Sequence, residues 1–202
     1  MKRSIRSLES LRGYKMQKME KTEYLFAEWT DLLSKGNRNR IKVFERIKIG
    51  EDFYNNFNGL TKIELFSGCF EPTSMKIAGE KVVGLLAENR QGEYFFNALF
   101  EDVTPGEVRE TKVWLEGRYT VPHIIPKGQG TYIYRSNFAW VGPHLQRLSF
   151  PKGYEILSFQ PEDGELSYSH GRPTITWRRA KEFWGEITVT FRDRNRGEGD
   201  NT

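Results

Sequence analysis

The feature that most limits the fold is a two-residue alternation of apolar and polar side chains, which recurs in short segments between residues 108 and 192. These segments are rich in aromatic residues and are separated by Pro and Gly. The last two, residues 172–177 and 184–191, flank a charged stretch at 178–182. Because side chains alternate between the faces of a strand, each segment can bury one face and expose the other. We expect a β-hairpin that closes a β-sandwich.

Similar segments upstream predict further strands, bounded by Gly, Pro and Asn. They cover residues 41–49, 60–66, 81–88, 94–101, 107–121, 131–135, 145–150, 155–159 and 165–169. Residues 89–92 predict a hairpin turn, with Gly92 at a positive φ, and residues 107–121 are long enough to bend or bulge near Gly117. Turn signals about ten residues apart are typical of sandwiches and barrels. The expected fold class is mainly β, an antiparallel β-sandwich or a partly closed barrel.

One segment near the N-terminus predicts an α-helix instead. Residues 22–35 place Leu25, Phe26, Trp29, Leu32 and Leu33 on a single helical face. Thr22 can cap the free amides of the first turn, and Gly36 followed by Asn37 suits the left-handed stop. We expect this helix to pack against the sheet.

The C-terminal quarter carries a pattern of a known kind. Residues 148–159, followed by 171–177, resemble the edge strand and closing hairpin of immunoglobulin-like modules. The resemblance implies an immunoglobulin-like or related sandwich. It rests on turns and strands that are common in β proteins, and the pair of cysteines flanking a tryptophan is absent.

Charge divides the chain into a basic leader and a nearly neutral body. Residues 1–21 hold seven basic and two acidic residues, which leaves a net charge of −1 for the remainder. We expect a flexible leader at 1–21, a single domain at 22–192 and a disordered tail at 193–202. The leader could contact acidic membrane or RNA, act as a transit peptide, or precede a true start at Met16 or Met19. Nucleic-acid binding by the neutral body is disfavoured.

Cysteine content and hydropathy favour a reducing compartment. Cys69 is the single cysteine, so no intramolecular disulfide can form. No apolar run has the length of a secretory signal core or of a membrane span. We therefore expect a cytoplasmic protein.

Sequence motifs for catalysis are weak. Cys69 lies at the end of an apolar strand without a nearby base, and neither phosphate-binding glycine pattern occurs, so we expect no cofactor. The alternative is a metal-dependent hydrolase or lyase on a β-barrel, in which His123, His144 and His170 meet at one end and hold the metal. Their spacing matches no known ligand motif.

Aromatic residues offer the more plausible active surface. The residues that we expect to bind a ligand are Trp140, Phe138, Tyr132, Trp114 and Arg172. Residues 122–130 and 137–144 are expected to be loops that carry this surface, together with the turn at 169–173. The predicted function is a non-catalytic binding or assembly module that recognises a protein or carbohydrate partner.

Overall fold

The computed structural model describes residues 26–32, 38–49, 56–121, 123–140 and 142–194, and over these residues the chain forms fifteen strands and no α-helix. The strands are β1 (Phe26–Leu32), β2 (Arg38–Lys48), β3 (Asn56–Phe57), β4 (Leu60–Gly68), β5 (Phe70–Gly79), β6 (Val82–Arg90), β7 (Glu93–Phe100), β8 (Val108–Tyr119), β9 (Ile124–Gly128), β10 (Thr131–Trp140), β11 (His144–Ser149), β12 (Tyr154–Gln160), β13 (Glu165–Ser169), β14 (Arg172–Arg179) and β15 (Phe183–Asp193). The prediction of a mainly β fold is confirmed.

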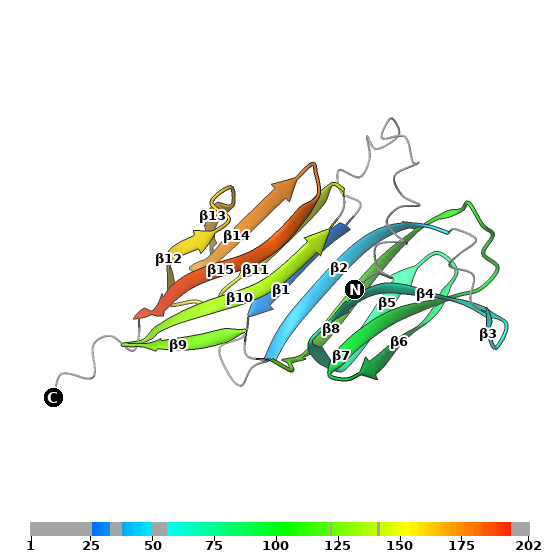
Figure 1. Ribbon diagram of the computed structural model, residues 1–202, viewed down its shortest axis with the longest axis horizontal. Helices are drawn as coiled ribbons and strands as arrows, with labels where there is room; N and C mark the ends of the chain where they lie inside the picture. The colour runs from blue at the N-terminus through cyan, green and yellow to red at the C-terminus, as the bar shows by residue number, and fades with distance from the viewer. Residues whose placement is uncertain (1–25, 33–37, 50–55, 122, 141, 195–202) are drawn as a thin grey trace.

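The strands form three sheets, shown in Figure 1. The largest has seven strands in the order β13-β14-β11-β1-β2-β8-β5, and the other two have four each, in the orders β12-β15-β10-β9 and β3-β4-β7-β6. Neighbouring strands pair antiparallel, except that β1 runs parallel to β11. Every sheet has two edge strands in the described part of the chain, so no sheet closes into a barrel there.

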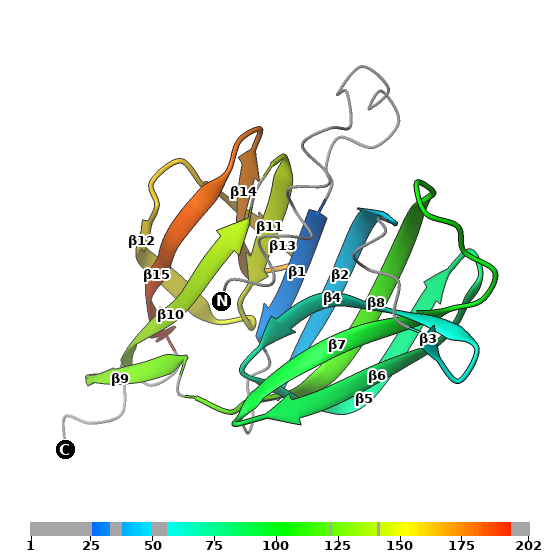
Figure 2. The same ribbon diagram turned by 45° about the vertical axis from the view of Figure 1, so that its right-hand side comes forward.

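Both four-stranded sheets pack on the same face of the seven-stranded sheet. Val43 in β2 pairs with Glu28, Glu28 pairs with Gln146, and Gln146 pairs with Trp177, so these four side chains share one face. Val43 belongs to a buried core with residues of β4 and β7, whereas Trp177 belongs to a second core with residues of β10 and β15. Figure 2 shows the two small sheets side by side over the large one. We call this covered side the inner face.

The strand and turn predictions hold in several places. In β2 the inner positions Ile41, Val43 and Ile47 are buried, as their alternation predicts. β6 and β7 form the predicted hairpin, in which Gln91 and Gly92 have φ values of 56° and 88°. Positive φ at both central residues suits the twist of a two-residue hairpin.

The N-terminal helix prediction is wrong. Residues 26–32 form β1, and the rest of the predicted helix lies outside the described residues. β1 pairs with the next strand, β2, on one side and with β11, far along the chain, on the other, so its backbone partners lie in other strands and not within a helix. Glu28 lies on its inner face between Phe26 and Thr30, which hides the two-residue alternation. Tertiary pairing here overrides a local helical pattern.

The prediction of a closing hairpin is also wrong, although both of the predicted strands are formed. β14 pairs with β11 and β13, whereas β15 pairs with β10 and β12. The turn at residues 180–182 therefore crosses from the large sheet to a small one. An immunoglobulin-like arrangement, which the hairpin implied, is not confirmed.

The two predicted ligand loops are largely strands. Residues 124–128 form β9, an edge strand that tolerates Pro126 because its outer amides need no ladder partner. β10 takes up residues 137–140, and β11 begins at His144. β5, which contains Pro72, is a further edge strand that the sequence pattern did not predict.

The leader at residues 1–21 and residues 195–202 of the predicted tail lie outside the described part of the chain. Within that part, no helix has the length and apolar character needed to cross a membrane.

Candidate functional site

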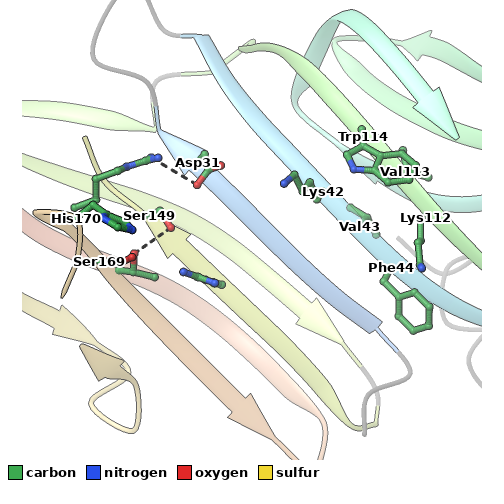
Figure 3. A pocket seen from close by; sticks show the side chains of 13 residues that line it. Asp31, Lys42, Val43, Phe44, Lys112, Val113, Trp114, Ser149, Ser169 and His170 are labelled. Atoms are coloured by element: carbon green, nitrogen blue, oxygen red, sulfur yellow. Dashed lines mark hydrogen bonds and ion pairs between the residues drawn. The ribbon is translucent and has the colours of Figure 1, made fainter. Parts of the chain in front are cut away.

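The face opposite the two small sheets carries a cavity of about 530 Å³. We call this side of the seven-stranded sheet the open face, and Figure 3 shows the side chains that line the cavity. Its polar and aromatic lining consists of Asp31, Lys42, Phe44, Lys112, Trp114, Arg147, Ser149, Ser169, His170, Arg172 and Thr174. They come from β1, β2, β8, β11, β13, β14 and the β13–β14 turn. A volume of this size is within the range of small-molecule sites.

Two ion pairs join β2 and β8 on the open face, one on each side of the cavity rows. Arg46 lies directly opposite Glu110 and forms an ion pair with it. At the other end, Arg40 lies opposite Glu116, with 3.5 Å between its Nε and a carboxylate oxygen. Opposite charges on directly facing positions are the usual way in which a sheet surface balances its charge.

Between these two ion pairs the pattern changes. Lys42 lies opposite Trp114, and Phe44 lies opposite Lys112, so each cation faces an aromatic residue where the flanking rows have a carboxylate. The ammonium of Lys76, on the next strand, lies 5.8 Å from the Trp114 ring centre. These central rows lie at the cavity, and in Figure 3 Lys42 and Trp114 project from neighbouring strands.

The other side of the cavity is built from hydroxyls and an ion pair. Arg172 lies 3.6 Å from a carboxylate oxygen of Asp31. The hydroxyls of Ser149 and Thr174 are hydrogen-bonded at 3.1 Å, and both residues are buried. His170 adjoins them in the turn between β13 and β14. A bound molecule would therefore meet hydroxyl groups on this side and cations with aromatic rings on the other.

The structure brings two of the five predicted ligand residues to this cavity. Trp114 and Arg172 both line it. Tyr132 instead packs against the core between the large sheet and the β12-β15-β10-β9 sheet, and Phe138 contacts both cores. The side chain of Trp140 is not among those that the structure describes, so its role in ligand binding stays a prediction.

The three histidines are not brought together. His144 is buried on the inner face, where its Nδ1 donates a hydrogen bond to the Gly142 carbonyl at 3.0 Å and burial lowers its pKa. The centres of the His123 and Tyr119 rings lie 3.9 Å apart. His170 lies on the open face. Among the described residues, no group of three or more His, Cys, Asp or Glu side chains could hold a metal ion.

A second polar group is buried on the inner face between the two cores. Thr30 donates a hydrogen bond to Glu28 at 2.9 Å, and burial raises the pKa of this carboxyl. Burial, together with the nearby Glu28, raises the pKa of Tyr134 to about 12. Burial also raises the pKa of Tyr119. These groups satisfy one another inside the protein, so we interpret them as structural.

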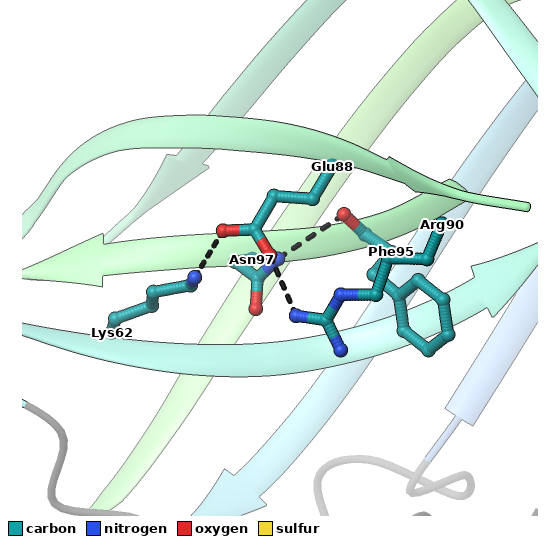
Figure 4. A network of polar contacts seen from close by, with 5 residues as sticks. All are labelled: Lys62, Glu88, Arg90, Phe95 and Asn97. Carbon is teal, nitrogen blue, oxygen red and sulfur yellow. Dashed lines mark hydrogen bonds and ion pairs between the residues drawn. The ribbon is translucent and has the colours of Figure 1, made fainter. Parts of the chain in front are cut away.

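The exposed face of the β3-β4-β7-β6 sheet carries a third polar group, shown in Figure 4. Glu88 accepts hydrogen bonds from Lys62 and from Arg90, the latter at 2.6 Å. The Arg90 guanidinium lies 4.5 Å from the centre of the Phe95 ring. Glu88 pairs with both cations, and Glu64 lies close enough to both to interact with them, so each charged group of this network has a partner of opposite charge.

The sequence did not indicate the charged residues Asp31, Lys42, Lys112 and Arg147 as part of a site, nor did it indicate Phe44, Ser149 and Thr174. In the sequence, Asp31 is a polar position of the predicted helix, and the others are ordinary positions of alternating strands. The signal that distinguishes them is the cross-strand neighbour of each residue, which depends on the strand register. Alternation indicates which side chains share a face of one strand, but it does not indicate which strands lie side by side.

Comparison with protein families and with curated proteins found no match. Partial structural likeness was found to native leukotriene A4 hydrolase from Saccharomyces cerevisiae, with a TM-score of 0.49 and 8% identity over 83% of this chain and 28% of that chain. A putative nutrient binding protein from Legionella pneumophila gives 0.44 and 10%, over 84% of this chain and 67% of that one. Legionella pneumophila aminopeptidase A in complex with aspartic acid gives 0.40 and 8%, over 82% and 21%. The chain thus spans 28% of the first of these proteins.

Proposed function

We propose that this protein is a non-catalytic binding module whose ligand site is the cavity on the open face of the seven-stranded sheet. The observation that carries the proposal is the lining of that cavity of about 530 Å³. Trp114 lies there with Lys42, Lys112 and Arg147, three cations that have no ion-pair partner among the described residues. Sites for small ligands combine an apolar or aromatic wall with a few oriented polar groups. The ligand is a carbohydrate or a segment of a partner protein.

The polar groups of the cavity favour binding over nucleophilic catalysis. An activated serine needs a base within hydrogen-bond reach. The hydroxyl of Ser149 is instead bonded to that of Thr174, and no hydrogen bond joins it to a basic side chain of the described residues. The free thiol, Cys69, lies at the β4–β5 connection and is not part of the lining.

Binding arrays test the proposal. The purified protein is applied to arrays of oligosaccharides and of peptides, together with Trp114→Ala and the matched variant Trp184→Ala. Trp184 is half exposed on a different sheet and does not line the cavity. We expect Trp114→Ala to weaken binding of the recognised compounds about ten-fold or more and Trp184→Ala to leave it unchanged. Equal binding by both variants, with both folded by circular dichroism, would refute the open face as the site.

A further inference from the structure

The charge of the cavity is unbalanced in one direction. Asp31 is the single carboxylate among the described residues that line it, and Asp31 is paired with Arg172. No ion pair joins Lys42, Lys112 or Arg147 to any residue that the structure describes. Lys42 and Arg147 pair with the same β1 residue from opposite sides, so they are two strands apart on one face. A ligand that carries negative charge would neutralise them.

The rows next to the cavity on the β2–β8 strand pair are balanced in charge. On the same face, Arg40 and Arg46 have carboxylate partners on β8, and between them β8 offers an aromatic ring and a further lysine. The missing carboxylates coincide with the space that a ligand would fill.

The backbone around the cavity argues against an extended peptide. β1, β2, β8, β11 and β14 each pair with a strand on both sides, so the floor that these strands form offers no free backbone amides or carbonyls. Peptides that bind sheets as added strands need a free edge, and β13, which contributes Ser169, is the one edge strand among the described strands of the lining. Recognition over the floor of the cavity must come from side chains.

The side chains that are present suit sugar rings. Trp114 supplies an aromatic surface against which the apolar face of a sugar ring can pack, and Ser149, Ser169 and Thr174 supply hydroxyls. The geometry therefore points to an anionic saccharide, carrying carboxylate or sulfate groups, as the ligand of the open-face cavity. This inference rests on the proposed function and adds the chemistry of the ligand to it.

Calorimetric titration with matched probes tests the inference. The full chain is titrated with oligogalacturonate and with its methyl ester, which has the same rings without the charge. Sulfated and unsulfated dextran fragments form a second pair, and oligoglutamate represents an acidic peptide. We expect at least one charged saccharide to bind at least ten-fold more tightly than its uncharged form, and binding to weaken as salt is raised from about 0.05 M to about 0.5 M.

Charge variants locate the interaction. Lys42→Gln and Arg147→Gln are each expected to raise the dissociation constant of the charged saccharide about ten-fold. Lys127→Gln removes an exposed lysine of β9, away from the cavity. This variant is expected to change the dissociation constant of the charged saccharide less than about two-fold. Trp114→Ala is included so that the site is tested independently of charge.

Each alternative result has a distinct meaning. A neutral saccharide that binds as well as the charged one, and that is lost in Trp114→Ala, overturns the anionic inference and leaves the binding module intact. Tight binding of oligoglutamate without any saccharide binding overturns the ligand class in the same way. Equal effects of Lys127→Gln and Lys42→Gln indicate unspecific attraction of polyanions and also overturn the inference. Saccharide binding that is unchanged in Trp114→Ala overturns the proposed function itself.

Discussion

At the scale of single residues, Glu45 is a buried carboxyl on the inner face. It is 5% exposed, and its Oε2 has no hydrogen-bond partner among the described residues. Burial raises the pKa of this carboxyl well above its ordinary value, and the nearby Glu64 raises it further. Its neighbours on the inner face of β2, Val43 and Ile47, are apolar. The folded protein therefore holds Glu45 in its protonated form at pH values where the unfolded chain ionises it.

This difference makes stability depend on pH with a defined sign. Below about pH 4.3 the carboxyl is protonated in both states, whereas above it the unfolded state loses the proton first and folding stability falls. Glu45→Gln does not titrate, so its free energy of unfolding should rise relative to that of the natural protein as the pH increases above about 4.3, at up to about 1.4 kcal/mol per pH unit, until the raised pKa of the folded state is reached. Urea unfolding at a series of pH values measures it. A constant or shrinking difference would contradict the assignment.

Glu88→Gln is the matched control, because it has the opposite sign. Hydrogen bonds from Lys62 and Arg90 lower the pKa of Glu88, so this carboxylate stabilises the fold above its ordinary pKa and loses that effect as the pH falls. The glutamine variant should be less stable than the natural protein at pH 8, by less than about 1 kcal/mol for a partly exposed group. The two proteins should converge near pH 4.

The roles of residues such as these could be predicted from the sequence only in part. Glu45 is visible in the sequence as the one charged residue among the apolar positions of an alternating strand. Lys42 and Phe44 fall on the opposite face from the same alternation. Their importance arises from Trp114 and Lys112, which lie about 70 residues later in the chain. The alternation within a strand predicts which face a side chain occupies, whereas its neighbours on the adjacent strand depend on the register of the folded sheet.

At the scale of elements, the pairing of β8 with the edge strand β5 depends on Gly117. A Cβ atom at this position would lie 2.1 Å from the Glu71 carbonyl oxygen and 2.9 Å from the Phe70 ring. The register shifts opposite this point, between Pro72 and Ser74, so the expected irregularity near Gly117 lies in the partner strand. The Glu71 carbonyl is part of the backbone, so it cannot move away from an added Cβ as the end of a flexible side chain can.

Gly117→Ala should therefore separate β5 from β8. We expect the free energy of unfolding to fall by about 1–3 kcal/mol, as for other overpacked sites. Hydrogen exchange of the β5 amides should accelerate more than that of β1 or β11 amides. Gly68→Ala is the control, because a Cβ there meets no atom within 4 Å. Thermal unfolding that is equally affected by both substitutions would argue against a role for the close backbone approach.

Predicted elements and observed elements agree better than their pairing does. β14 and β15 were expected from their alternation and are formed, yet they lie in different sheets. The charged turn between them is compatible with a hairpin or with a crossover, and the choice depends on which sheet edges are free. β1 was missed because its apolar residues also fit one face of a helix, while Glu28 takes an inner position of the strand.

At the scale of the whole molecule, two cores share one continuous sheet. One core lies beneath β4 and β7 and the other beneath β10 and β15, while the pairing of β1 with β2 carries the large sheet across both. The Phe138 ring lies 6.0 Å from that of Phe26 in the first core and 6.4 Å from that of Phe183 in the second. Strand pairing and side-chain packing both couple the two halves.

This coupling predicts that the described body unfolds as one cooperative unit. Phe96→Ala removes a ring buried in the first core, and Trp177→Ala removes one buried in the second, each at a cost of about 3–5 kcal/mol. In urea, either variant should show one transition at a lower midpoint, with fluorescence and far-ultraviolet circular dichroism coinciding. Hydrogen exchange should then report faster opening of β7 and β14 together in both variants, because neither half keeps its sheet neighbours when the other is lost. Two separate transitions in Trp177→Ala, with β7 still protected after β14 has opened, would show that the large sheet divides at β1 and β2 into independent halves.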